Sequence, residues 1–347
     1  MRWILLLFIL PELASAEPPV PDTAKLNQEQ LQKAFRLLRE DFVHPGELSF
    51  LRINRFALAG ILDSLGPRAR LISGDGGAMA RPKGAVVESF PPFAGYIRPN
   101  AFNEEERETM TRALEKFSSE SIPSLLLDLR SPDNDPALSD CLRFLDHFLP
   151  EGTVAFKVQR DADSTEAFST KSTAFSWDGG IILLIDGEVS VGAEVVAHCL
   201  RHLVSERTLV VGAPSGGNAA AYSLVPLGDA LSLRFATARI LLEDGTDLFQ
   251  NPVIPEIHVP VFPAIKHAVF SQSLETGLRP FLEDKERPVL NEAALVAGTN
   301  PELQGSNTPS ARAPQPEAPP IQDRCLQLAL DFARTKGALR GQRTKPE

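Results

Sequence analysis

The stretch GGIILLIDGEVSVGAEVVAHCL, residues 179–200, decides the fold of this chain. It begins with a continuous apolar run that ends at Ile185, which is typical of a β-strand buried on both faces. After the turn 186–190, apolar residues such as Val195 and Cys199 recur at helical spacing. The stretch therefore predicts a buried strand that runs through a short turn into a helix. Enzymes with α/β folds often place a nucleophile at such a junction.

Similar apolar runs lie on either side of this stretch. SLLLDLR (124–130) and TLVVGAP (208–214) predict two more buried strands. AGYIRP (94–99) also predicts a strand. Between them, Asn103 and Glu106 form a capping box that predicts the start of a helix. Further helices are expected at 136–149 and 191–206, and further strands at 221–227, 230–240 and 253–259. This alternation predicts a mostly parallel α/β core.

Composition and charge limit the classes of function. The chain has 347 residues, of which 43% are hydrophobic and 23% are charged, a globular composition. Its formal net charge is −10 and it has no basic cluster, so no nucleic-acid partner is expected. The segment GAPSGGN (212–218) resembles a phosphate-binding loop but lacks the following Lys-Ser/Thr. We therefore predict a turn there and no cofactor.

The first residues, MRWILLLFILPELASA, have the layout of a secretory signal peptide. Arg2 precedes a short apolar run, and a small-x-small site ends at Ala16. The apolar run is too short to span a bilayer. We expect residues 1–16 to be removed, the protein to be exported to the periplasm or the exterior, and no membrane span to remain. Residues 17–80 then predict an N-terminal helical segment, with helices at 27–43 and 49–65.

The C-terminal part of the chain changes in composition. Residues 263–294 form an extension of the core, and residues 295–322 predict a flexible Pro-rich linker. Residues 323–347 predict a short helix and a charged tail, with Leu326 and Leu330 on one helical face. The sequence leaves open whether this helix docks on the core. Cys141 and Cys199 lie on apolar helical faces and are predicted to be buried free thiols.

Several segments of the core occur in a characteristic order and spacing. These are GYIRPNAF (95–102), LLLDLR (125–130), FLPEGTV (148–154), IILLIDGEVSVGAEVVAHCL (181–200), LVVGAPSGGN (209–218) and VPLGDALSLRFATARI (225–240). They resemble the catalytic core of the tail-specific, or C-terminal-processing, serine peptidases. The resemblance implies a ββα-spiral (crotonase/Clp-like) α/β fold over residues 85–262. Too few residues separate Ser73 from Gly95 for the PDZ domain that many family members carry.

The resemblance also indicates which residues occupy the catalytic positions. The family nucleophile lies three residues before a glutamate, here Glu194, so its position is taken by Val191. Ser190 is one residue out of register and is predicted to be a helix N-cap or turn residue. Asn218 stands where the family has its lysine base, and an amide cannot accept the proton. Gly187, Ser215, Gly216 and Gly217 are the residues expected to line the groove and the oxyanion region.

The turn that follows LLLDLR is also unusual. SPDNDP (131–136) has no glycine, two of its residues lack an N–H, and its aspartates oppose a developing oxyanion. The simplest interpretation is a surface turn. With the nucleophile and the lysine also replaced, the sequence predicts an exported pseudopeptidase that binds a peptide, a protein segment or a small apolar ligand. The alternative is an active serine endopeptidase that uses Ser190 or Ser215. Its base would be a residue such as His44, His147, His258 or His267.

A possible metal site lies on the helix that follows the turn. Glu194, His198 and His202 recur four residues apart and share one helical face, and such a set can bind zinc. Because the apolar residues of this helix mark the opposite face as the core side, we interpret the Glu/His row as its solvated side. No metal is predicted.

Overall fold

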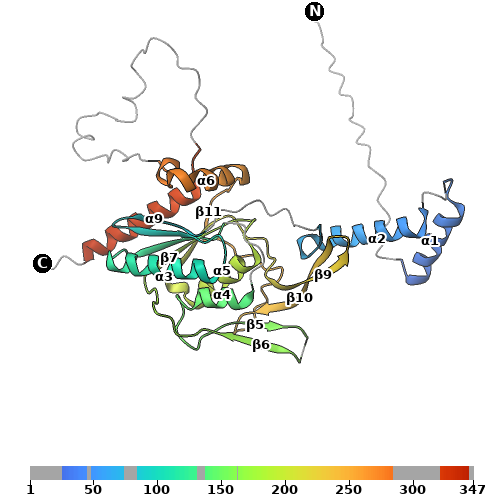
Figure 1. The fold of residues 1–347 in the computed structure, drawn as a ribbon, viewed down its shortest axis with the longest axis horizontal. Helices are drawn as coiled ribbons and strands as arrows, with labels where there is room; N and C mark the ends of the chain where they lie inside the picture. Colours follow the sequence, from blue (N-terminus) through green and yellow to red (C-terminus); the bar gives the residue numbers. More distant parts are fainter. Residues whose placement is uncertain are drawn as a thin grey trace, which may run out of the picture. The chain divides into compact units, whose positions relative to one another are not determined.

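The computed structural model describes residues 26–44, 48–73, 84–130, 137–161, 163–283 and 321–343, with side chains as far as Lys336 (Figure 1). Contacts within the chain divide it into two units, Met1–Gly66 and Pro67–Glu347. The proposed signal peptide, the turn 131–136 and the linker up to residue 320 lie outside the described residues. Within the described part, no helix is long and apolar enough to cross a membrane.

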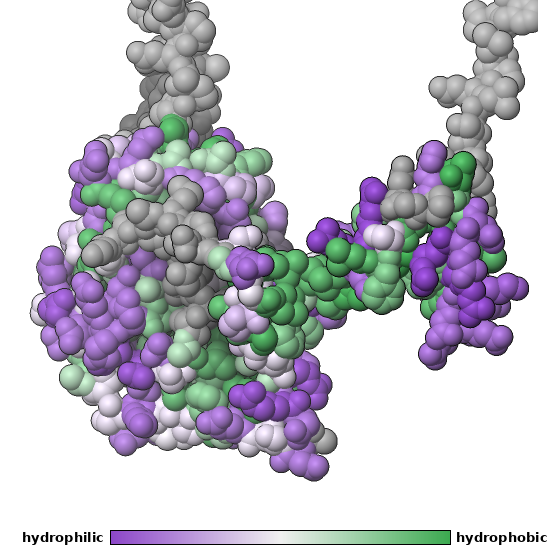
Figure 2. All heavy atoms as spheres, turned by 45° about the vertical axis from the view of Figure 1, so that its right-hand side comes forward, coloured by the Kyte–Doolittle hydropathy of each residue, from purple (hydrophilic) through white to green (hydrophobic). Residues whose placement is uncertain are grey.

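The first unit consists of two amphipathic helices, α1 (Gln28–Asp41) and α2 (Phe50–Leu65). Asn27 and Gln30 form a reciprocal capping box at the start of α1, and Ser49 caps α2. Neither helix has a buried residue, and both expose large hydrophobic side chains. Figure 2 shows hydrophobic residues covering much of α2. Both helices were expected from the sequence.

The second unit contains a six-stranded sheet in the order β11-β8-β7-β4-β3-β2. Its central strands are parallel, and only the edge strand β2 runs antiparallel to its neighbour. In β3, β4 and β7 every residue is buried, and for β4 and β7 the continuous apolar runs predicted this burial. The bounds are β2 (Val86–Phe90), β3 (Ala94–Arg98), β4 (Ser124–Asp128), β7 (Gly180–Ile185), β8 (Thr208–Gly212) and β11 (Ile257–His258). The prediction of a mostly parallel sheet is confirmed.

A second sheet of five strands is antiparallel and extends the core. Its order is β1-β10-β5-β6, with β9 also paired to β10. The strands are β1 (Ala69–Ser73), β5 (Val154–Gln159), β6 (Thr165–Ser169), β9 (Ala220–Gly228) and β10 (Leu231–Leu241). The sequence predicted β9 and β10 but not the other three. Strand β1 pairs with β10, so residues 69–73, placed in the N-terminal helical segment by the sequence, belong to the core sheet.

Helices cover both faces of the six-stranded sheet (Figure 1). One face packs on α3 (Glu104–Ser119), α4 (Leu138–Leu145) and α5 (Val191–Leu203). The other face is covered by α9 (Arg324–Arg343), and α6 (Pro263–Thr276) lies on that side too. Successive residues of a strand place their side chains on opposite faces of the sheet. Leu125 and Leu127 therefore pack in the first layer, and Leu126 packs in the second.

The C-terminal helix α9 therefore docks on the core, a point that the sequence left open. Leu326, Leu330 and Ala333 are buried against the sheet, as the predicted helical face requires. Cys141 and Cys199 are buried free thiols, as expected. Together the layers form a mixed α/β core, whose β7–α5 junction positions the candidate site.

Candidate active site

The turn between β7 and α5 is held by local hydrogen bonds. Ser190 is the N-cap of α5, and its hydroxyl oxygen accepts a hydrogen bond from the Ala193 N–H at 3.2 Å. Asp186 closes the turn because its carboxylate accepts the Glu188 N–H at 2.9 Å. Val191 is half-buried and is the first residue of the helix. The N-cap interpretation of Ser190 is thus confirmed.

A nucleophile at this turn needs a base within hydrogen-bonding reach. In the described part of the chain, no histidine or lysine side chain makes a hydrogen bond to Ser190 Oγ. His147 is buried and contacts Thr111 at 2.7 Å, and burial lowers its pKa to about 4. His267 is exposed and contacts Glu188 at 3.0 Å. The other two candidates, His44 and His258, are exposed.

Glu194 fastens the loop 213–219 to the first turns of α5. Its carboxylate accepts the Ser215 hydroxyl, the Gly217 N–H at 2.6 Å and the Asn218 N–H at 2.7 Å. Burial nevertheless raises the pKa of Glu194. Ser215 Oγ also accepts the Val253 N–H at 2.7 Å, so its proton and one lone pair are both engaged.

The loop that carries Asn218 lies directly against the β7–α5 turn. A Cβ placed on Gly216 would come within 3.6 Å of the Gly187 carbonyl oxygen, and one on Gly187 within 3.8 Å of the Pro214 carbonyl oxygen. Gly217 has a φ of +67°, a conformation that glycine adopts without strain. The structure thus brings the expected groove residues Gly187, Ser215, Gly216 and Gly217 together beside the start of α5. The region between turns 186–190 and 213–218 is called the candidate groove below.

The interpretation of the Glu/His row as the solvated side of α5 is wrong. Glu194 and His198 are buried, because the loop 213–219 and Asn251 cover this face. His198 Nε2 lies 2.9 Å from the Asn251 carbonyl oxygen, and burial lowers its pKa to about 4. His202 alone is exposed. Among the described residues, no group of three or more His, Cys, Asp or Glu side chains is placed to hold a metal ion.

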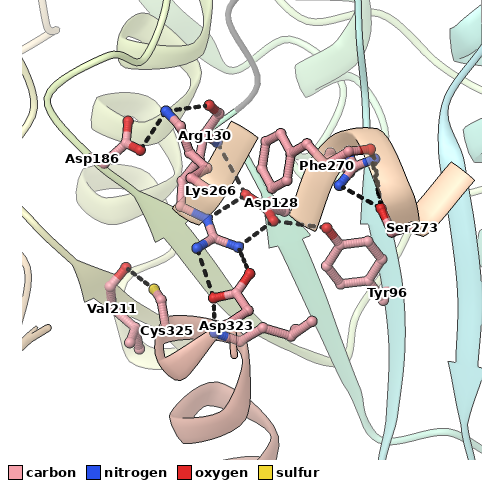
Figure 3. Close-up of polar contacts among 12 residues, drawn as sticks. Tyr96, Asp128, Arg130, Asp186, Val211, Lys266, Phe270, Ser273, Asp323 and Cys325 are labelled. Carbon is pink, nitrogen blue, oxygen red and sulfur yellow. Dashed lines mark hydrogen bonds and ion pairs between the residues drawn. The ribbon is translucent and has the colours of Figure 1, made fainter. Parts of the chain in front are cut away.

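A buried ionic network lies at the carboxyl ends of β4 and β7 (Figure 3). Arg130 pairs with Asp128 at 2.7 Å and with Asp323 at 2.8 Å, and the Tyr96 hydroxyl donates to Asp128 at 2.7 Å. Burial alone would raise the pKa of Asp128, but Arg130 outweighs it and holds that pKa below its ordinary value. This network joins the end of β4 to the start of α9.

Lys266 of α6 forms the second part of this network, beside Arg130. Arg130 and Lys266 also line a pocket of about 420 Å³ between α6 and the start of α9. The sequence analysis did not single out Lys266 or Asp323. Both lie beyond the recognised motifs, in segments whose composition does not show that they fold back onto the core.

Residues 94–259 match the model of peptidase family S41. The match ends before α6 and α9, so the layer that covers the second face of the sheet lies outside it.

The similar curated proteins are named as carboxy-terminal-processing proteases. The carboxy-terminal-processing protease of Bartonella bacilliformis is 25% identical over 197 residues, which are 55% of this chain and 45% of that protein. The carboxy-terminal processing protease CtpB of Bacillus subtilis is 24% identical over 166 residues, 48% of this chain and 34% of that protein. The matched regions thus span less than half the length of these relatives.

Solved structures of similar fold include the photosystem II D1 C-terminal processing protease. It is 19% identical with a TM-score of 0.43, and the match covers 61% of this chain and 52% of that one. Mature CPAF complexed with lactacystin is 12% identical with a TM-score of 0.40, covering 55% of this chain and 53% of that one.

Proposed function

We propose that this protein is a pseudopeptidase that binds a peptide or protein segment in the candidate groove without cleaving it. The observation that carries this proposal is the state of the Ser190 hydroxyl. Its oxygen caps α5, and no histidine or lysine in the described residues is hydrogen-bonded to it. A serine without a base is a weak nucleophile. The family position itself holds Val191, which has no group that can attack a carbonyl.

The neighbouring loop supports the same proposal. Asn218 takes the place of the family lysine, and its backbone N–H is bound by Glu194. Ser215 is the other serine beside the groove. Its hydroxyl donates a hydrogen bond to Glu194 and accepts one from the Val253 N–H. Ser215 can give its proton to another base only if its bond to Glu194 breaks. Neither Val191 nor Asn218 has a side chain that can serve as that base.

The proposed ligand follows from the class of fold. The relatives are named as proteases that process carboxyl termini, and such enzymes must hold an extended segment. Extended peptides bind through main-chain hydrogen bonds and side-chain pockets, which do not need catalytic groups. A small apolar molecule is the competing ligand. The N-terminal sequence supports export, which is tested by finding residues 1–16 absent from the mature protein by mass spectrometry.

Reactivity towards a fluorophosphonate probe tests the proposal. The purified protein is incubated with the probe and, separately, with casein as a disordered substrate. We expect no labelling and no cleavage, together with saturable binding of a fluorescent casein peptide. The double variant Val191→Ser/Asn218→Lys restores both family residues and serves as the matched comparison. Cleavage gained by that variant would show that the groove still admits a substrate.

Labelling of the parent protein would overturn the proposal. If the label disappears in Ser190→Ala, the protein is an active peptidase with a shifted nucleophile. If it disappears in Ser215→Ala instead, the nucleophile lies in the second loop. Saturable binding of a neutral apolar dye, with no binding of the casein peptide, would point to the small apolar ligand.

A further inference from the structure

A buried lysine joins the ends of two neighbouring strands at the edge of the candidate groove. Lys266 comes from α6 and its side chain is 1% exposed. Its ammonium group lies 3.2 Å from the Arg130 carbonyl oxygen and 2.6 Å from Asp186 Oδ2 (Figure 3). It also lies 2.7 Å from Glu188 Oε2. An ammonium group has three N–H donors, and three acceptors surround it.

The partners of Lys266 belong to the two strand ends that border the site. Arg130 directly follows β4, whereas Asp186 and Glu188 form the turn that leads to the Ser190 N-cap. Strands β4 and β7 are parallel neighbours, so their carboxyl ends lie at the same edge of the sheet. Lys266 therefore bridges this edge from outside the sheet.

Asp186 connects Lys266 to the hydrogen bonding of the turn 186–190. One carboxylate oxygen accepts the Glu188 N–H at 2.9 Å, and the other binds Lys266. The same carboxylate thus organises the turn and ties it to α6. His267, the next residue of α6, contacts Glu188 at 3.0 Å, but its side chain is exposed and does not reach β4.

Burying an ammonium group costs free energy unless paired charges and hydrogen bonds replace its lost hydration. The carboxylates of Asp186 and Glu188 and the Arg130 carbonyl supply these contacts. Because the contacts reach both strand ends, they can fix the relative position of those ends. Catalysis as a base is a poor alternative, because two carboxylates and a carbonyl hold all three protons in place.

We propose that Lys266 is a positioning residue that fixes the turn 186–190 against the end of β4. In this arrangement α6, which lies outside the S41 match, completes the candidate groove. The role of the turn in ligand binding rests on the proposed function. The positioning of the turn by Lys266 does not, and it is measured separately.

Hydrogen–deuterium exchange of the full chain, followed by mass spectrometry, tests the proposal. In Lys266→Met we expect the amides of residues 186–190 to exchange at least about tenfold faster, while those of β9 and β10 stay unchanged. His267→Gln is the matched control on the same helix and should leave this exchange close to that of the parent. Met110→Ala, a core cavity variant on α3, controls for a general loss of stability.

Two results would overturn the proposal. In the first, the exchange of residues 186–190 in Lys266→Met stays unchanged. In the second, it rises only as much as the exchange of the whole sheet, as in Met110→Ala. If Lys266→Met does not fold, Lys266→Arg replaces it. Arginine keeps the charge but cannot direct three N–H groups from one atom, so the turn should still exchange faster.

Binding of the fluorescent casein peptide separates this proposal from the proposed function. A parent protein that does not bind the peptide refutes peptide binding, yet the exchange of the turn still reports on Lys266. If the parent binds, we expect the affinity to fall about tenfold in Lys266→Met and to stay unchanged in His267→Gln.

Discussion

Ser190 shows how one hydroxyl can serve structure or chemistry but rarely both. As an N-cap it accepts a backbone N–H that the first turn of α5 cannot otherwise satisfy. A nucleophile must instead give its proton to a base and approach a carbonyl. The residue that follows, Val191, begins α5 and has no group that can react with a carbonyl. The contacts of Ser190 are those of a helix N-terminus.

The capping role predicts a defined loss of stability. Ser190→Ala should lower the free energy of unfolding by about 1 kcal/mol, because the Ala193 N–H loses its acceptor. Ser190→Thr keeps a hydroxyl and should remain within a few tenths of a kcal/mol. Urea denaturation of the three proteins measures the difference. Equal stability of all three would mean that the cap contributes nothing, leaving the hydroxyl free for another role.

Local rules predicted Ser190 but failed for its neighbours on α5. An N-cap depends on residues within one turn, so the sequence contains the whole signal. The burial of Glu194 and His198 depends on the loop 213–219 and on Asn251, which are distant from the start of α5 in the sequence. The helix alone therefore indicated a solvated face where the fold places a buried one.

At the scale of elements, a buried ion pair joins the start of α9 to the end of β4. Asp323 precedes the helix, accepts the Leu326 N–H at 3.0 Å and pairs with Arg130. Arg130 is 1% exposed and its second partner is Asp128. One carboxylate thus caps α9 and compensates a buried charge at the end of β4.

Removing this carboxylate should cost far more than removing a surface one. Asp323→Asn is expected to destabilise the protein by about 3 kcal/mol, since it weakens the compensation of a buried guanidinium. Asp331→Asn, which breaks an exposed pair with Arg334 on the same helix, should cost less than about 1 kcal/mol. Thermal unfolding of both variants measures this. Similar losses in the two would mean that apolar contacts alone dock α9.

The elements themselves differed in how far the sequence predicted them. Strands β4 and β7 were evident because burial on both faces demands continuous apolar runs. Strand β6 was not, since its residues are partly or fully exposed and its sequence TEAFS alternates weakly. The amphipathic face of α9 was visible, but its partner was not, because the preceding Pro-rich segment carries no information about where the helix returns.

For the whole molecule, two buried histidines join segments that are distant in the sequence. The Thr111 hydroxyl donates to the Arg107 carbonyl at 2.9 Å, so it receives its second hydrogen bond from His147 Nε2. His198 donates from Nε2 to the Asn251 carbonyl oxygen. Both rings are therefore neutral donors in the folded protein, and protonating either places a charge in a buried site.

Acid should therefore weaken the fold well before the carboxylates titrate. Burial lowers the pKa of both His147 and His198 from 6.5 to about 4. Between these two pH values the histidines are protonated in the unfolded chain but neutral in the folded protein. The stability from these neutral rings is complete above pH 6.5 and is lost as the pH falls towards 4. By pH 5 the loss should reach about 2 kcal/mol for each histidine. Urea denaturation between pH 7.5 and 5 measures it.

Glutamine variants assign this acid sensitivity to particular residues. His198→Gln and His147→Gln keep an N–H donor but cannot take up a proton, so each should remove about half of the loss between pH 7.5 and 5. His258→Gln alters an exposed ring and should leave the pH dependence of the parent unchanged. If the double variant His147→Gln/His198→Gln still loses as much stability as the parent, other buried groups must bind the protons. The two rings would then be polar contacts that tolerate a charge in the folded protein.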